Sequence, residues 1–220
     1  MTIKPNVALA IDTSAGTTVA LVSGERVLAQ HDIESNMSHA ESIGTAIEAV
    51  LAEAKISAAD VTEVIAGRGP APYTGLRVGL AAATMFAAGR NLPLHGVVSL
   101  DAIALRHFAE NGQGSSKPGA NEGRPASSHL LVTTDARRKE VFWAIYQAEP
   151  FARIEGPAVN TPADLEEILG NRQIEITTAK VSGEYIAKVA TLIGDEKFDS
   201  SAIYLRAPDA VPSPGKKVSG

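Results

Sequence analysis

The stretch that most constrains the fold is residues 67–79, which hold four glycines and two prolines. A largely apolar run, residues 61–66, precedes it, and a long helical pattern, residues 76–88, follows it. Proline fixes its own φ and pushes the preceding residue to extended geometry, so neither a strand nor a helix crosses residues 67–72 easily. Thr74 stands where a helix N-cap belongs, so we expect a strand, a rigid loop and a capped helix. Two interpretations are open: an anion site at the helix N-terminus, or simply a tight strand-to-helix connection.

Composition and charge exclude several classes of protein. The chain has 220 residues, 45% of them hydrophobic, a net charge of −5 and no cysteine. It therefore has no disulfide, cysteine nucleophile or thiolate metal site. The densest basic run is residues 137–139, and without a longer basic stripe we expect RNA to bind only with a partner's help. The apolar run at residues 7–11 is too short for a signal peptide or a membrane span, so we expect a soluble cytoplasmic protein.

The first half of the chain predicts three strands followed by alternating helices and strands. Ser38 and Glu41 form a capping box, and the residues after them place apolar side chains on one helical face. The expected strands are residues 7–11, 17–22, 27–33, 61–66 and 94–98, and the expected helices are residues 39–54, 75–88 and 99–109, the last capped by Ser99. This order predicts a mixed sheet between helices.

The second half repeats the start of the first half and then stops early. Residues 111–128 lack apolar periodicity and read as a flexible linker or surface loop. The expected elements after it are strands at 129–134, 140–147, 151–155 and 174–181, a helix that begins at Pro162 with Thr161 as its cap, and a helix at 184–193. We therefore expect a first subdomain at residues 1–110, the linker at 111–128, a truncated second subdomain at 129–206 and a disordered tail at 207–220.

Two such halves, each of βββαβα type and each opening with a strand hairpin, resemble the duplicated α/β fold of actin, hexokinase and Hsp70 (the ASKHA fold). In that fold the first hairpin cradles nucleotide phosphates. Asp12, Thr13 and Ser14 follow the first strand here and resemble that hairpin. The resemblance implies an ASKHA duplication in which the second subdomain is truncated.

A narrower resemblance rests on motifs that occur in a fixed order along the chain. They are residues 9–14, 38–41, 69–79, 96–100, 135–141 and 204–206. Together they closely resemble the TsaB (YeaZ) family of bacterial proteins of tRNA threonylcarbamoyladenosine synthesis. Each motif is weak by itself, and it is the ordered set that is specific.

This resemblance implies a scaffold rather than an enzyme. Members of the family are degenerate relatives of the catalytic subunit TsaD. With a TsaD-like subunit and a TsaE-like ATPase, such a protein helps to move a threonylcarbamoyl group from its adenylate to N6 of adenosine 37 in tRNAs that read ANN codons. It would need no cofactor of its own, because ATP and a metal ion belong to the partner subunits. It would meet tRNA only within the complex, and both a monomer and a homodimer stay open for the chain when it is alone.

The histidine pattern bears on catalysis. TsaD-like subunits carry two histidines at i and i+4, which share a helix face and can ligate one ion. Here His39 is followed at i+4 by Ile43, so we expect no metal site and no catalytic residue. Two alternatives remain: an ASKHA-type ATP-dependent phosphotransferase, which would need a complete second half, and a metallopeptidase, which would need bound metal.

Two further groups of residues have both a functional and a structural interpretation. Asp12, Thr13 and Ser14 are a candidate nucleotide or phosphate loop, but Asp12 is equally a polar strand terminus. Arg137 and Arg138 are candidates for contacts with RNA phosphates, although such pairs often lie exposed in a hairpin turn.

Small residues form a stripe along the helix after the central loop. Glycine inside a helix costs about 0.5–1 kcal/mol relative to alanine, so Gly79 implies the close approach of another part of the protein. One interpretation is a neighbouring helix of the same domain, and the other is the interface with a TsaD-like partner. The predicted interface consists of His39, Ile43, Gly75, Gly79, Ala82, Ala83 and Ala87.

Overall fold

The first half of the chain forms a five-stranded mixed sheet. In the computed structural model, which describes residues 6–33, 39–111, 129–193 and 199–206, the strand order is β3-β2-β1-β4-β5. The strands are β1 (Ala8–Asp12), β2 (Thr17–Ser23), β3 (Arg26–Ile33), β4 (Glu63–Gly67) and β5 (Leu94–Val97). β1, β2 and β3 form an antiparallel meander, whereas β4 and β5 run parallel to β1. The predicted order of strands and helices is confirmed.

The second sheet repeats this topology with one strand fewer. Its order is β8-β7-β6-β9, with β6 to β8 antiparallel and β9 parallel to β6. The strands are β6 (His129–Asp135), β7 (Val141–Gln147), β8 (Ala152–Asn160) and β9 (Glu175–Thr177). The expected strand at 174–181 is much shorter than predicted, and the one at 151–155 is longer. The described residues thus form an ASKHA duplication whose second half is truncated.

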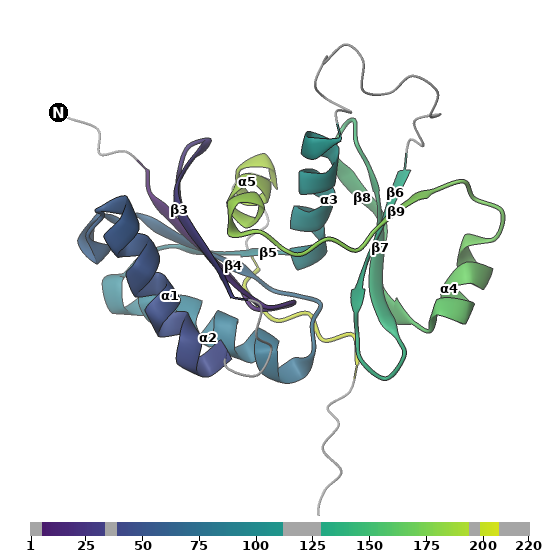
Figure 1. The fold of residues 1–220 in the computed structure, drawn as a ribbon, viewed down its shortest axis with the longest axis horizontal. Helices are drawn as coiled ribbons and strands as arrows, with labels where there is room; N and C mark the ends of the chain where they lie inside the picture. The colour runs from purple at the N-terminus through teal and green to yellow at the C-terminus, as the bar shows by residue number, and fades with distance from the viewer. Residues whose placement is uncertain (1–5, 34–38, 112–128, 194–198, 207–220) are drawn as a thin grey trace, which may run out of the picture.

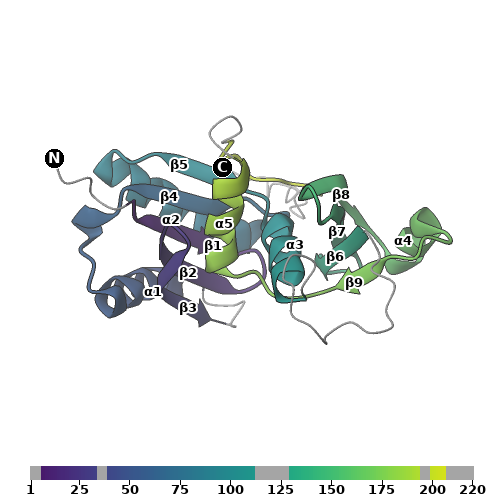
Figure 2. The same cartoon turned by 90° about the horizontal axis from the view of Figure 1, so that it is seen from above.

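Helices cover both faces of the first sheet and separate the two sheets. The helices are α1 (His39–Ala54), α2 (Tyr73–Arg90), α3 (Ser99–Glu110), α4 (Pro162–Leu169) and α5 (Gly183–Ile193), with a short 3₁₀ helix at Ala58–Asp60. Figure 1 shows α1 and α2 on one side of the first sheet and α3 and α5 between the two sheets. Figure 2 shows α5 over the first sheet and α3 beside the second. Each half therefore contributes its last helix to the sheet of the other half.

This exchange produces a core to which both halves contribute. Ala10 and Ala20 on the inner face of the first sheet share one apolar cluster with Ile103 of α3, Tyr146 of β7 and Ile186 of α5. Burial of that apolar surface stabilises the two halves against each other. A second cluster lies between the opposite face of the first sheet and helices α1 and α2.

Two predicted helix caps are wrong, while a third is confirmed. α2 begins at Tyr73 after Pro72, and α3 begins at Ser99 after Val98, neither with a side-chain cap. Thr161 does cap α4, because its hydroxyl accepts a hydrogen bond from the N–H of Asp164. The predicted linker at 111–128 and tail at 207–220 lie outside the described residues, apart from Asn111.

Candidate functional site

The central loop is held to the start of α3 by hydrogen bonds on both sides. The N–H of Gly69 donates to Ser99 Oγ at 3.1 Å, and the N–H of Ser99 donates to the Gly69 carbonyl at 2.8 Å. The N–H of Arg68 donates to the Val97 carbonyl at 2.8 Å. These N–H groups of the loop are therefore used within the protein, which favours the tight-connection interpretation over an anion site.

Asp12 lies at the centre of this junction and is only 1% exposed. One carboxylate oxygen accepts hydrogen bonds from the N–H and the hydroxyl of Ser14, at 2.7 and 2.6 Å. The other accepts from the hydroxyl of Ser99 at 2.5 Å. A Cβ atom at Gly67 would collide with this carboxylate, so the end of β4 must be glycine for Asp12 to fit. Buried carboxylates need such donors to offset the loss of hydration.

Thr13 links the same junction to the first turn of α2. Its hydroxyl donates to the Gly75 carbonyl at 2.7 Å and accepts from the N–H of Gly79 at 3.1 Å. A Cβ at Gly79 would overlap the Thr13 hydroxyl. Gly79 is therefore explained by close approach, as predicted, but the group that approaches is the loop after β1 and not a neighbouring helix.

Burial corrects the predicted partner interface. Ile43, Gly79, Ala83 and Ala87 are buried inside the first half, so a partner that docks on this conformation cannot contact them. The prediction is wrong at these four positions because Ile43, Ala83 and Ala87 pack in the apolar cluster against the protein's own sheet, and Gly79 packs against Thr13. Of the other predicted interface residues, Gly75 and Ala82 are partly exposed, and His39 is the first residue of α1. At these three positions the interface stays a prediction.

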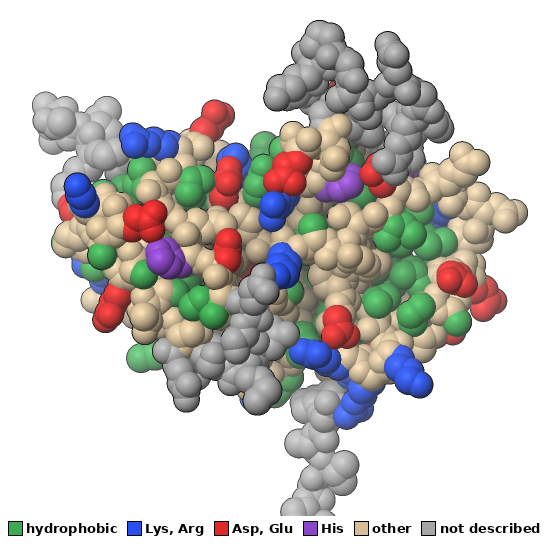
Figure 3. Space-filling model, viewed as in Figure 1, with side chains coloured by type: hydrophobic (Ala, Val, Ile, Leu, Met, Phe, Trp, Pro, Cys, Tyr) green, Lys and Arg blue, Asp and Glu red, His purple; other side chains and the backbone are tan. Residues whose placement is uncertain are grey.

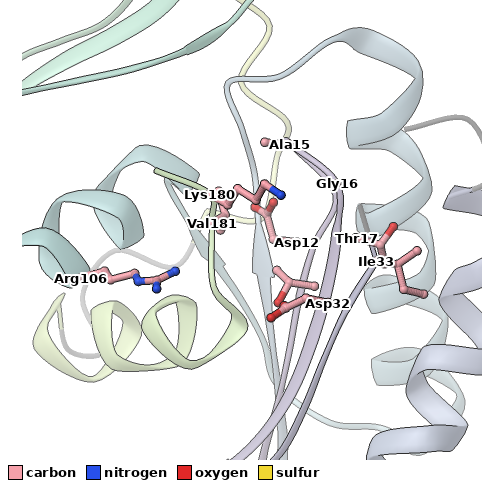
Figure 4. A pocket seen from close by; sticks show the side chains of 10 residues that line it. Asp12, Ala15, Gly16, Thr17, Asp32, Ile33, Arg106, Lys180 and Val181 are labelled. Carbon is pink, nitrogen blue, oxygen red and sulfur yellow. The ribbon is translucent and has the colours of Figure 1, made fainter. Parts of the chain in front are cut away.

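Two cavities lie where the turn after β1 meets the second half. The smaller, of about 150 Å³, is lined by Asp12, Ala15, Gly16, Thr17, Thr18, Asp32, Ile33, Arg106, Lys180 and Val181. Figure 4 shows the side chains of Asp12 and Lys180 pointing toward one another in it. The larger, of about 550 Å³, also contains Ala15 and Lys180 and extends to Lys139, Thr133 and Val141 of the second half. The first hairpin therefore faces a cleft between the halves, although the side chains of Thr13 and Ser14 are engaged elsewhere.

Arg137 and Arg138 lie in the exposed turn between β6 and β7. Asp135 Oδ1 accepts a hydrogen bond from the N–H of Arg137 at 2.7 Å, and the N–H of Ala136 donates to the Glu140 carbonyl at 3.0 Å. The turn is thus closed by its own backbone and by one carboxylate. Arg137 and Arg138 are not among the residues that line the two cavities, and their contact with RNA stays a prediction.

A C-terminal strap, residues 199–206, was not predicted from the sequence, where residues 204–206 stood out only as the last motif. It is irregular and crosses from the first half to the second. Arg68 pairs with Asp199 Oδ2 at 2.7 Å, and the N–H of Ile203 donates to the Arg68 carbonyl at 2.9 Å. At its other end Arg206 pairs with Glu140. The one signal available was the arginine that ends the last motif.

The ring of Tyr204 in this strap lies 4.7 Å from that of Tyr73 at the start of α2. The guanidinium of Arg77 lies 3.6 Å from the centre of the Tyr73 ring, a cation–π distance. The two ends of the strap are therefore held by ion pairs, and Tyr204 between them packs against the start of α2.

Among the described residues, no group of three or more His, Cys, Asp or Glu side chains is arranged to hold a metal ion. In the same part of the chain, no helix is both long and apolar enough to cross a membrane.

The repeated sheet topology and the cleft between the halves define an α/β protein of the actin/hexokinase (ASKHA) fold. The chain belongs to the TsaD family, whose sequence model, described as tRNA N6-adenosine threonylcarbamoyltransferase, matches residues 27–204. Within it, the resemblance to TsaB (YeaZ) proteins is confirmed by the relatives below.

Three proteins illustrate what the chain is similar to. It is 37% identical over 166 residues to an uncharacterized protein of Mycobacterium tuberculosis, covering 72% of this chain and 66% of that protein. It is 28% identical over 179 residues to the Escherichia coli tRNA threonylcarbamoyladenosine biosynthesis protein TsaB, covering 81% of this chain and 68% of that protein. Its structure is similar to YeaZ from Pseudomonas aeruginosa, with a TM-score of 0.72 and 22% identity over 91% of this chain and 100% of that one. The matched part spans only 40% to 66% of the length of the mycobacterial relatives.

Proposed function

We propose that this chain is a non-catalytic subunit of the assembly that transfers a threonylcarbamoyl group to N6 of adenosine 37 in tRNAs that read ANN codons. The observation that carries the proposal is the TsaD-family match over residues 27–204, in a chain that resembles the E. coli protein named TsaB. Such a subunit would work in the cytoplasm, where tRNA is modified.

The lack of catalysis is supported by two features of the first half. Ile43 is a buried apolar residue at the i+4 position where a metal-binding helix would need its second histidine after His39. Asp12 is engaged by Ser14 and Ser99, so its carboxylate serves the fold of the junction. ATP and the metal ion would then belong to a TsaE-like ATPase and a TsaD-like catalytic subunit.

The outer surface of α1 and α2 is the face that we propose for the TsaD-like partner. Helices α1 and α2 pack on the sheet through Val50, Ala83 and Ala87, which leaves their opposite side to solvent. Met85 lies on that side of α2 and is 75% exposed, which is unusual for a long apolar side chain in a helix. The same surface would pair with a second copy when the partner is absent.

Reconstitution tests this proposal. The chain, the TsaD-like protein and the TsaE-like protein of the same organism are purified separately and supplied with threonylcarbamoyl adenylate, ATP and unmodified tRNA transcript. We expect the modified nucleoside, measured by mass spectrometry of digested tRNA, only when this chain and the TsaD-like protein are both present. Modification by this chain alone, or full modification in its absence, would overturn the proposal.

The larger cavity supports one alternative, an ATP-dependent phosphotransferase. Lys139 and Lys180 both line it, and lysines commonly bind phosphates. Under this alternative the purified chain would turn over ATP in the presence of a small-molecule acceptor. The scaffold proposal expects no turnover above that of a Lys180→Ala variant.

A further inference from the structure

The turn between β6 and β7 places three consecutive basic residues in the left-handed backbone region. The φ angles of Arg137, Arg138 and Lys139 are 63°, 54° and 62°. This region is unfavourable for residues with a Cβ atom, and glycine or asparagine usually occupies it. A turn that served only to reverse the chain would be more stable with those residues. The choice of arginine and lysine therefore points to a role for the side chains.

Arg137, Arg138 and Lys139 lie at the surface of the protein, where all three residues are exposed. Arg206 pairs with Glu140 and donates to the Ala136 carbonyl at 3.1 Å, so it fixes the base of the turn and offsets the charge of Glu140. The Arg137–Asp135 pair, at 3.3 Å, is more than half exposed and exchanges readily with water.

Charge sets this turn apart from the rest of the molecule. The chain carries a net charge of −5, yet Figure 3 shows Lys and Arg side chains gathered at the lower edge, where Figure 1 places the turn between β6 and β7. Lys139 also lines the larger cavity, so the turn borders the cleft between the halves. A local positive surface on an acidic protein favours an anionic partner at this place.

We propose that residues 137–139, the basic turn, bind consecutive backbone phosphates of RNA. This identification of the partner as tRNA rests on the proposed function. Planar guanidinium groups bind phosphate oxygens through two parallel hydrogen bonds, and contacts of this kind position an RNA without reading its sequence. These three side chains extend from successive residues of an exposed turn. Such an arrangement fits a row of backbone phosphates better than a single enclosed phosphate group.

The test removes the three positive charges and uses replacement residues that accept the positive φ angles of the turn. In an Arg137→Gly, Arg138→Gly, Lys139→Gly triple variant, glycine accepts the same φ angles, so the hairpin should still form. The matching asparagine variant keeps the test valid if glycine loosens the turn. Lys55→Gly is the control for the single Arg138→Gly change, because Lys55 is also basic, exposed and left-handed, with a φ of 55°.

Binding of unmodified tRNA transcript is measured at several salt concentrations, for the complex with the TsaD-like protein and for the full chain alone at low salt. Each lost phosphate contact should lower the slope of log K against log salt by about 0.7–0.9. We expect the triple variants to lose about 2 units of slope and roughly 10- to 100-fold in affinity near 0.15 M salt. Arg138→Gly should lose about one unit, and Lys55→Gly none.

The outcomes separate this proposal from the proposed function. If wild-type chain and partner do not assemble, the proposed function fails, and the low-salt measurement on the chain alone still decides the role of the turn. Wild-type affinity and slope in the triple variants would overturn the role of the turn. So would normal tRNA binding combined with loss of the partner, because the basic turn would then meet an acidic protein surface.

Discussion

The two hairpins that open the two halves share one local design but differ in their surroundings. In each, an aspartate ends the first strand, and one of its oxygens accepts a hydrogen bond at 2.7 Å from the N–H two residues later. Asp12 is 1% exposed, whereas the side chain of Asp135 is 65% exposed. The turn of the first hairpin therefore has a buried aspartate, whereas the aspartate in the turn of the second hairpin is exposed to solvent.

The truncation explains this difference. In the first half, β5 leads into α3 and so brings Ser99 onto Asp12. The second sheet has no strand in the position that β5 occupies beside β4, and nothing equivalent to Ser99 reaches Asp135 among the described residues. Loss of one crossover has thus freed the second hairpin for surface contacts, while the first became part of the protein core.

The largest effect should follow from filling the space at Gly79. Gly79→Leu forces a side chain into the position of the Thr13 hydroxyl, so we expect the free energy of unfolding to fall by about 3 kcal/mol. Chemical denaturation with circular dichroism measures it. Retention of wild-type stability would mean that Gly79 and Thr13 are packed less tightly than their hydrogen bond implies.

A smaller effect should distinguish the two aspartates directly. Asp12→Ala leaves the Ser99 hydroxyl and the Ser14 N–H without their acceptor in a buried place, which should cost about 2 kcal/mol. Asp135→Ala breaks an exposed ion pair and one turn hydrogen bond, and should cost about 0.5 kcal/mol. Equal losses in the two variants would contradict the contrast between a buried and an open hairpin.

A buried carboxylate between the halves gives a test by pH. Asp101 of α3 accepts a hydrogen bond from the Tyr146 hydroxyl at 2.7 Å, and burial raises its pKa above the ordinary value of 3.8, although Arg153 opposes the shift. Between the two pKa values the folded form binds more protons than the unfolded form, so the contribution of Asp101 to stability falls as pH rises. The stability of wild type minus that of Asp101→Asn should therefore decline from about pH 4 upward and then level off.

The matched control is Asp135→Asn in the exposed second hairpin, measured over the same pH range. A wild-type advantage over Asp101→Asn that grows with pH would mean that Arg153 and Tyr146 outweigh burial. The interface between the halves would then be held by an ion pair rather than by apolar packing alone.

Sequence periodicity was sufficient for the order of strands and helices because apolar alternation and runs reflect which face of each element is buried. It also placed Asp12 and Asp135 at strand ends. It could not assign Ser99, because a serine before a helical pattern looks like a cap, while its hydroxyl bonds Asp12, 87 residues away. Contacts of that separation leave no local pattern in one sequence.

The partner interface predicted from the small-residue stripe was wrong for a related reason. Spacing shows that Gly79, Ala83 and Ala87 share a helix face, but it does not say whether that face meets the protein's own sheet or a partner. The left-handed turn was also hidden, because arginine and lysine are not the residues that signal positive φ.

The last test uses a second glycine of α2, where a small gain in stability is expected. Gly89 is exposed, and a Cβ there would meet nothing within 4 Å, in contrast to Gly79. Gly89→Ala should therefore raise the free energy of unfolding by about 0.5–1 kcal/mol through helix propensity alone, whereas Gly79→Ala should lower it despite the same gain in propensity. Opposite signs from one substitution in one helix would locate the need for glycine at the Thr13 contact. If both variants were stabilised, the contact between Gly79 and Thr13 would tolerate a methyl group. The contrast between the two hairpins would then rest on Asp12 and Ser99 alone.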